Sequence, residues 1–287
     1  MNNDKTIELL NSTGIPFQDW VAHCIGKVGC YHYEPEVPYS ISDYDGTIDI
    51  VAAWFRSDDH FLAPFQGNIF LVIEAKRADP SIKNWLFVKD VHKKYHKFYN
   101  SSFISISKNQ ANADETHVEN GLTFPTLGYR TQDNFDKCIN GFEYNEKFVL
   151  NRSSENKIHK PFLQVHRGLN GFASGTPIIQ KHKFDLSKRK VYLPIVVITA
   201  NIFTVDYNPS DIELPGAVIN PSKANLSSKK WITYEYPLSN QLGRLQNQPL
   251  KTEKLTTFIV QANSWEKFLN SVFVVYGVGS ILDCDIL

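Results

Sequence analysis

The sequence predicts an α/β fold in which a mixed central β-sheet is flanked by helices, with an inserted, largely helical accessory region. Two observations indicate it. Apolar, β-rich runs occur in the first hundred residues and again after residue 190, with helical periodicity between them, and the middle of the chain is polar and interrupted. A length of 287 residues fits one large domain. We therefore predict a single domain over 1–287, with its core at 1–100 and 191–287 and the accessory insertion at about 101–190.

The first third of the chain contains two strands between two helices. Phe17, Val21 and Ile25 recur at helical spacing, and Gly29 ends the helix that they predict. The run from Ile69 to Ile73 is continuously apolar, as in a strand buried on both faces. The elements expected here are a helix at 15–27, an extended segment at 31–39, strands at 47–54 and 68–76, and a helix at 81–99.

The rest of the chain is helical at first and then rich in strand signal. Gly and polar residues punctuate the middle, which is typical of an accessory region rather than a second core. The expected elements are helices near 134–148 and 157–172, strand within 191–205, strands at 231–236 and 256–261, and a closing helix from Ser264 to about Val274, with Ser264 as its N-cap.

Composition favours a soluble, cytoplasmic protein. Hydrophobic residues make up 42% and charged residues 21%, a globular balance. The four cysteines form no Cys-x-x-Cys pair, the start lacks the shape of a signal peptide, and no apolar run is long enough to cross a bilayer. Gly-x-Ser-x-Gly, phosphate-loop and zinc-protease motifs are also absent from the sequence.

Charge is segregated although the formal net charge is zero. Residues 1–75 are strongly acidic, whereas residues 76–97 and 147–190 are strongly basic. Such blocks suit an enzyme that holds a divalent cation and binds a polyanion, although solvated surface helices give the same pattern.

The residues with the strongest chemical signal are Asp49, Glu74 and Lys76, on the two early strands. Glu74 and Lys76 are two residues apart and therefore share a face of their strand, and Asp49 reaches them if the strands are antiparallel neighbours. Two carboxylates and a backbone carbonyl, that of Ala75, suit Mg²⁺. A lysine beside them can orient or deprotonate a water and stabilise charge on a phosphate.

The acidic-x-Lys triplet alone is a weak signal, because Glu155-Asn156-Lys157 repeats it in a polar stretch. The first triplet stands out because it closes an apolar run, where a charged pair is costly to bury without a partner. The alternative is an ordinary Glu–Lys pair at the surface end of a strand.

At these residues the sequence resembles the PD-(D/E)XK, or restriction-endonuclease-like, nuclease superfamily. The resemblance is an order of parts over about residues 15–100: helix, turn, strand with Asp49, loop, strand with Glu74-Ala75-Lys76, helix. It implies a restriction-endonuclease-like core, Asp49 and Glu74 as Mg²⁺ ligands with Mn²⁺ able to substitute, and Lys76 as catalytic base or stabiliser. Ile48 replaces the proline of the motif.

Two glutamines are candidate supporting residues. Gln18 occupies the first-helix position where many members of the superfamily place a glutamate, so a second metal would be held more weakly. Gln164 lies on a predicted later helix, and some members place a glutamine of such a helix in the site; a plain surface or capping role is the alternative.

A row of basic residues on the expected 81–99 helix is the candidate nucleic-acid contact, because phosphate contacts dominate affinity for nucleic acids. The alternative is a solvated helix face. The candidate contacts are Lys83, Lys89, Lys93, Lys94 and Lys97.

Two functions from different classes remain. The first is a Mg²⁺-dependent endonuclease acting on DNA, with RNA as an alternative, in bacterial restriction or defence against phage, as a homodimer or within a larger defence complex. The second is a nucleic-acid-binding module with the nuclease fold and weak or no activity, which the glutamine at position 18 favours.

Overall fold

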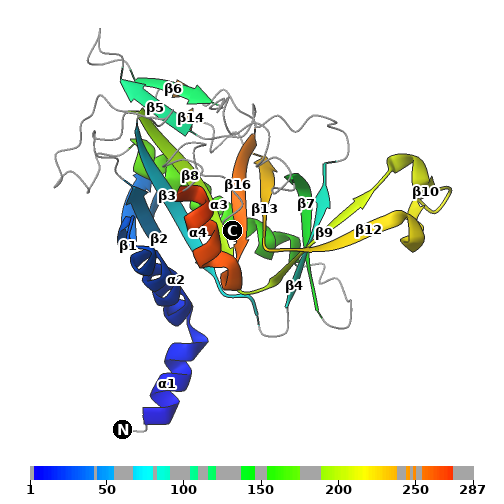
Figure 1. Cartoon of the computed structure of the whole chain (residues 1–287), viewed down its shortest axis with the longest axis horizontal. Helices are drawn as coiled ribbons and strands as arrows, with labels where there is room; N and C mark the ends of the chain where they lie inside the picture. The colour runs from blue at the N-terminus through cyan, green and yellow to red at the C-terminus, as the bar shows by residue number, and fades with distance from the viewer. Residues whose placement is uncertain are drawn as a thin grey trace.

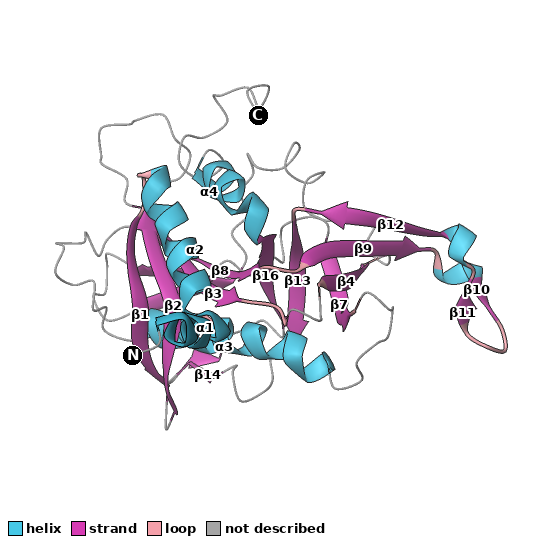
Figure 2. Cartoon of the chain, turned by 90° about the horizontal axis from the view of Figure 1, so that it is seen from below, coloured by secondary structure: helices cyan, strands magenta, loops and turns pink. Residues whose placement is uncertain are grey.

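The computed structural model has a large mixed β-sheet with helices on both faces (Figures 1 and 2). It describes residues 3–41, 44–54, 67–79, 83–90, 104–108, 116–120, 137–145, 154–174, 189–237, 244–245, 248–249 and 254–273. The helices are α1 (Asn3–Ser12), α2 (Ile15–Val28), α3 (Ser154–Ser174) and α4 (Trp265–Phe273). The strands are β1 (His32–Ile41), β2 (Tyr44–Trp54), β3 (Gly67–Lys76), β4 (Asn84–Lys89), β5 (Ile104–Lys108), β6 (Thr116–Asn120), β7 (Lys137–Tyr144), β8 (Arg189–Ile198), β9 (Asn201–Tyr207), β10 (Ile212–Glu213), β11 (Val218–Ile219), β12 (Ala224–Lys229), β13 (Trp231–Pro237), β14 (Arg244–Leu245), β15 (Gln248–Pro249) and β16 (Lys254–Gln261).

The sheet combines an antiparallel end with a parallel centre. In the described residues its strands follow the order β1-β2-β3-β8-β16-β13-β7-β4-β9-β12, and β5 joins β6 to β8. The pairs β1–β2 and β2–β3 are antiparallel, whereas β3–β8 and β8–β16 are parallel. Central parallel strands are covered on both faces, which explains the continuous apolar runs of β3 and β8.

Two buried clusters, one on each face of the sheet, hold the helices in place. On one face Val51 and Val72 pack with Phe162 and Leu169 of α3. On the other face the neighbouring strand residues pack with Val21 of α2 and with α4. Successive strand side chains point to opposite faces, so each strand supplies both clusters. The result is a three-layer α/β arrangement, with α2 and α4 on one side and α3 on the other (Figure 2).

Most expected elements near the site are confirmed. The first helix, the strands at 47–54 and 68–76, the helix at 157–172 and the strands at 231–236 and 256–261 all form, with boundaries shifted by a few residues. The single strand expected within 191–205 is two strands, β8 and β9, which are separated at Thr199 and Ala200. The closing helix forms as α4, and Ser264 lies in the 3₁₀ turn that precedes it.

The helix expected at 81–99 is wrong at 84–89, which form β4 between β7 and β9. Trp85 and Phe87 are fully buried, whereas Leu86 and Val88 are half-buried, so the burial has a period of two residues. Trp85 and Val88 are three residues apart, and this spacing suggested a helix. The rest of that predicted helix lies largely outside the described residues.

The helix expected near 134–148 is also wrong, because 137–144 form β7 within the main sheet. Gly141 of β7 permits a close approach, since a Cβ there would lie 2.6 Å from a ring carbon of Phe87 on β4. In the described part of 101–190, the structure thus has three complete strands, the first two residues of β8 and one helix, rather than a largely helical region. Pairing with distant strands outweighed local helical spacing.

The hairpin of β9 and β12 extends away from the rest of the sheet as an arm that ends in β10 and β11 (Figures 1 and 2). Asn208 and Asn220 each cap a 3₁₀ turn, and a 3.1 Å salt bridge joins Lys223 to Asp211 across the arm. In the part of the chain that is described, none of the helices has the length and apolar character required to span a membrane.

Candidate active site

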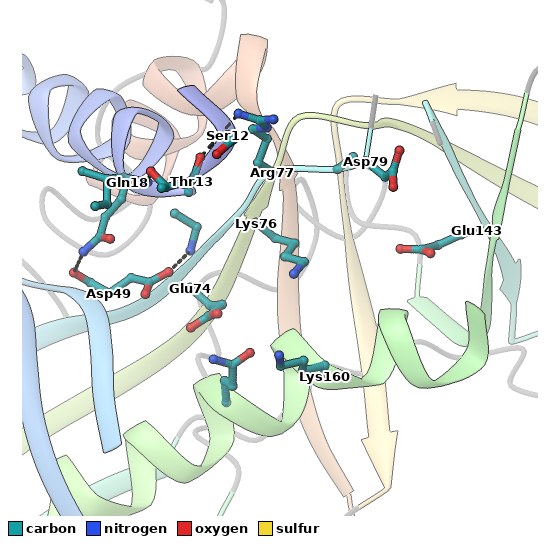
Figure 3. Close-up of a pocket in the computed structure, with 15 residues that line it drawn as sticks. Ser12, Thr13, Gln18, Asp49, Glu74, Lys76, Arg77, Asp79, Glu143 and Lys160 are labelled. Atoms are coloured by element: carbon teal, nitrogen blue, oxygen red, sulfur yellow. Dashed lines mark hydrogen bonds between the residues drawn. The ribbon is translucent and has the colours of Figure 1, made fainter. Parts of the chain in front are cut away.

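A pocket of about 730 Å³ opens at the end of β3 and beside the middle of β2, between α2 and α3 (Figure 3). All five residues that the sequence assigned to catalysis or its support line this pocket. They come from four elements: Gln18 from α2, Asp49 from β2, Glu74 and Lys76 from β3, and Gln164 from α3. The structure therefore brings together side chains that are up to 146 positions apart in the chain.

Asp49 is fixed by two hydrogen bonds of different kinds. The antiparallel pairing of β2 with β3 ends at Ile50 and Ile73, so Asp49 lies one residue beyond the paired region. There its Oδ2 accepts a 2.8 Å hydrogen bond from the backbone N–H of Ala75, and its backbone carbonyl accepts a 2.9 Å bond from Nε2 of Gln18. The Asp49 side chain thus accepts from the N–H of β3 the hydrogen bond that a backbone carbonyl of β2 would accept if the strand pairing continued, and this bond holds the carboxylate beside β3.

The strand carrying Asp49 changes face at this residue. Ile48 packs in the cluster on the α3 side, whereas Ile50 packs in the cluster on the α2 side, although residues two apart in a regular strand share a face. On β1, Glu36 falls opposite Asp49 in the antiparallel register and has a φ of +50°. Such a conformation is rare outside glycine, and it marks an interruption of both strands at the site.

Glu74 is buried and electrostatically strained. Its side chain is only 6% exposed, which does not fit an ordinary surface Glu–Lys pair. Burial, and then repulsion from Asp49, raise the pKa of Glu74 to about 8, against smaller opposing effects of Lys76 and Lys160. Burial also raises the pKa of Asp49, against the hydrogen bond from Ala75. A cation bound between two neighbouring, desolvated carboxylates would stabilise their charged forms, because it offsets both the burial and the repulsion.

Helix α3 approaches β2 closely enough to form the other wall of the pocket. A Cβ at Gly168 would lie 2.6 Å from Cγ1 of Ile48, the neighbour of Asp49. Only a glycine permits this contact without a shift. One turn earlier in α3, Gln164 reaches the pocket, and one turn before that, so does Lys160.

The pocket includes charged residues that the sequence did not single out. Arg77 donates from Nη1 to the backbone carbonyls of Asn11 and Thr13, which ties the turn between α1 and α2 to the end of β3. The basic block at 147–190 and a spacing of four residues from Gln164 were the available signals for Lys160. The pocket residues missed by sequence reasoning that carry charge are Arg77, Asp79, Glu143 and Lys160.

The predicted nucleic-acid contacts are not assembled at this site. Lys83 and Lys89 do not line the pocket, and Lys89 lies on β4 rather than on a helix. Lys93, Lys94 and Lys97 lie outside the described residues. The basic helix face that would have carried all five is therefore replaced, at least over β4, by a strand inside the sheet.

The groups of this pocket that could hold a metal are two carboxylates and a main-chain carbonyl. Among the described residues, no group of three or more His, Cys, Asp or Glu side chains is arranged to hold a metal. In a strand the N–H and C=O of one residue point the same way, so the carbonyl of Ala75 faces the Asp49 side, as its N–H does. Asp49, Glu74 and this carbonyl are hard oxygen ligands of the kind that Mg²⁺ prefers.

Comparison of the chain with protein-family models, with curated proteins and with solved structures found no match.

Proposed function

We propose that the chain is a Mg²⁺-dependent endonuclease that hydrolyses phosphodiester bonds of DNA, with Asp49, Glu74 and Lys76 as its active-site residues. The observation that carries this proposal is the meeting of the two carboxylates with Lys76 in one pocket at the end of β3. The order α2, β2 with Asp49 and β3 with Glu74 and Lys76 follows the PD-(D/E)XK resemblance, in antiparallel strands β1 to β3. The helix expected directly after β3 is replaced by β4, and β4 to β7 precede α3, which leads into β8, parallel to β3.

Asp49, Glu74 and the carbonyl of Ala75 would hold the metal. The raised pKa values of both carboxylates support this assignment, because a cation offsets the burial and repulsion that cause the shift. Bound there, Mg²⁺ would activate a water and neutralise charge on the phosphate. The protein contributes fixed ligands: the hydrogen bond from Ala75 and the bond from Gln18 orient Asp49 before metal or substrate arrives.

Lys76 would act in the chemical step itself. An ammonium donates hydrogen bonds and accepts none, so Lys76 cannot be a metal ligand while charged. It extends into the pocket from the same face as Glu74 (Figure 3). From there its Nζ can stabilise the charge that develops on a non-bridging phosphate oxygen, or hold the attacking water.

A cleavage assay tests this function directly. We would incubate the protein with plasmid, single-stranded DNA and RNA in Mg²⁺, Mn²⁺ or EDTA, with a Glu74→Gln variant as the matched control. Metal-dependent nicking or linearisation by the wild type alone would support the proposal. Cleavage of RNA only would make the chain a ribonuclease. Tight binding of nucleic acid without cleavage in either Mg²⁺ or Mn²⁺ would favour the nucleic-acid-binding module. A role in restriction or phage defence would then require another, catalytic chain.

A further inference from the structure

We propose that Lys160 of α3 forms a phosphate-binding subsite opposite Lys76, and that it grips the nucleic-acid backbone inside the pocket without taking part in the chemical step. The proposal rests on the nuclease function above and adds to it the residue that holds the substrate.

The first argument is the way α3 is anchored. Ile158, Phe162 and Val165 are buried against the sheet, with at most 1% exposure. Lys160 lies on the pocket side, one turn from Gln164, and its side chain is exposed. The backbone is fixed, while the ammonium group is accessible to a ligand.

The second argument is the charge around the pocket. Its lining includes the cations Lys76, Arg77 and Lys160. The guanidinium of Arg77 is engaged with the carbonyls of Asn11 and Thr13. The side chains of Lys76 and Lys160 instead extend from opposite walls, from β3 and from α3, toward the same space beside Glu74 (Figure 3).

Two ammonium groups that face one space attract an anion into it. In the metal-free protein the Asp49–Glu74 pair supplies part of that negative charge. A divalent cation on Asp49 and Glu74 would neutralise it, and the space would then be lined by the metal and two lysines. A phosphodiester, with its negative charge and several acceptor oxygens, is the ligand that fits such a space. The two lysines thus have different roles: Lys76 on β3 acts in the chemical step, and Lys160 on α3 binds the substrate.

The test measures DNA binding in Ca²⁺, so that its outcome does not depend on cleavage. We would titrate a labelled duplex at several salt concentrations with wild type, Lys160→Gln, Lys160→Arg and the control Lys267→Gln, an exposed helical lysine outside the pocket. Lys160→Gln should weaken binding about tenfold. It should also flatten the slope of log affinity against log salt by about 0.9, the value of one phosphate contact on duplex DNA. Lys160→Arg should retain both values, and Lys267→Gln should match the wild type.

Two further measurements separate phosphate binding from other roles. Without DNA, Mn²⁺ affinity of Lys160→Gln should equal or exceed that of the wild type, because the substitution removes a positive charge near the metal ligands. In cleavage assays KM should rise about tenfold with kcat within about threefold. An unchanged salt slope, a parallel loss of Mn²⁺ affinity, or a fall in kcat at constant KM would each overturn the proposal. Salt-dependent binding by a wild type that cuts nothing would instead refute the nuclease function and leave the subsite standing.

Discussion

The two walls of the pocket are built by different means. The strand wall, Asp49 with Glu74 and Lys76, is set by the register of β2 and β3 and by a hydrogen bond from the main chain of Ala75. The helix wall, Lys160 with Gln164, has its position from the packing of α3 against the sheet and from the close contact at Gly168. The strand wall contains a buried carboxylate, Glu74, beside the half-buried Asp49, whereas the helix wall presents an exposed lysine.

This difference suggests how the two walls share the work. A metal site requires ligands held rigidly and kept from water, and a sheet supplies both. An exposed lysine on a helix suits the binding of a long, flexible substrate, because its ammonium group remains solvated until a phosphate binds it. Substitutions on the strand wall should therefore abolish metal binding and chemistry, and substitutions on the helix wall should weaken substrate binding.

The largest effect is expected for the carboxylates. Asp49→Asn keeps an acceptor for the N–H of Ala75 but removes the charge. Glu74→Gln removes the charge at the more buried position with little change in shape. Each should lower cleavage on the order of 1,000-fold or more and weaken Mn²⁺ binding in calorimetry, with the fold retained. Asp79→Asn, an exposed carboxylate of the same pocket, is the control and should bind Mn²⁺ normally. Wild-type Mn²⁺ affinity in both strand variants would contradict the assignment of the metal site.

Lys76→Gln should come next, with metal and DNA binding close to wild type and cleavage about 100-fold slower. Interactions made only in the transition state raise kcat without tightening ground-state binding. Single-turnover kinetics under saturating DNA would measure this loss. If binding and cleavage fell together, Lys76 would be a phosphate contact like Lys160, and the division between the walls would disappear.

Gly168→Ala should disturb the helix wall through its contact with the strand wall. The new methyl group would overlap the buried Ile48 side chain, so α3 must move away from β2. We expect a destabilisation of about 1–3 kcal/mol in urea or thermal unfolding, together with weaker DNA binding. Gly26→Ala on α2 is the control, since its nearest neighbour is the partly exposed ring of Tyr33; it should be neutral or slightly stabilising. A Gly168→Ala protein as stable as the wild type would show that α3 has room to shift.

The smallest effect concerns pH. In the folded, metal-free protein Glu74 has a pKa raised to about 8 from 4.5, so the folded state binds the proton more tightly than the unfolded chain. Stability from this group is complete below pH 4.5 and is lost as the pH rises toward 8. The Tm in EDTA should therefore fall by about a few degrees between pH 5 and pH 8. Glu74→Gln should remove much of this fall, and a divalent metal should raise Tm most at the alkaline end.

A rise of Tm with pH across that range in EDTA would mean that Glu74 is already ionised in the folded protein. The charged forms of the two carboxylates would then be stabilised by water or by protein groups without a metal. The strand wall would in that case be solvated like the helix wall.

The sequence alone was sufficient for the strand wall. The apolar run 69–73 ends in Glu-Ala-Lys, and the strand before it contains Asp49. Side chains alternate along a strand, so the sequence shows that Glu74 and Lys76 share a face. The apolar character of both runs shows that the strands are buried. From this local pattern Asp49, Glu74 and Lys76 could be predicted to lie together, and α2 and α3 could be predicted as helices. The Mg²⁺ and DNA assignments remain predictions.

Tertiary structure alone decided the rest. Segments 84–89 and 137–144 have apolar spacing that is compatible with a helix, and they became strands because β9 and β13 offered backbone partners from far along the chain. The sequence puts Lys160 one helical turn from Gln164, but only the tertiary structure puts it in the pocket. That position depends on how closely α3 approaches β2, and hence on Gly168 meeting Ile48 across 120 residues of chain. Local periodicity determines which face a side chain occupies, but only the packing of distant elements determines what that face meets.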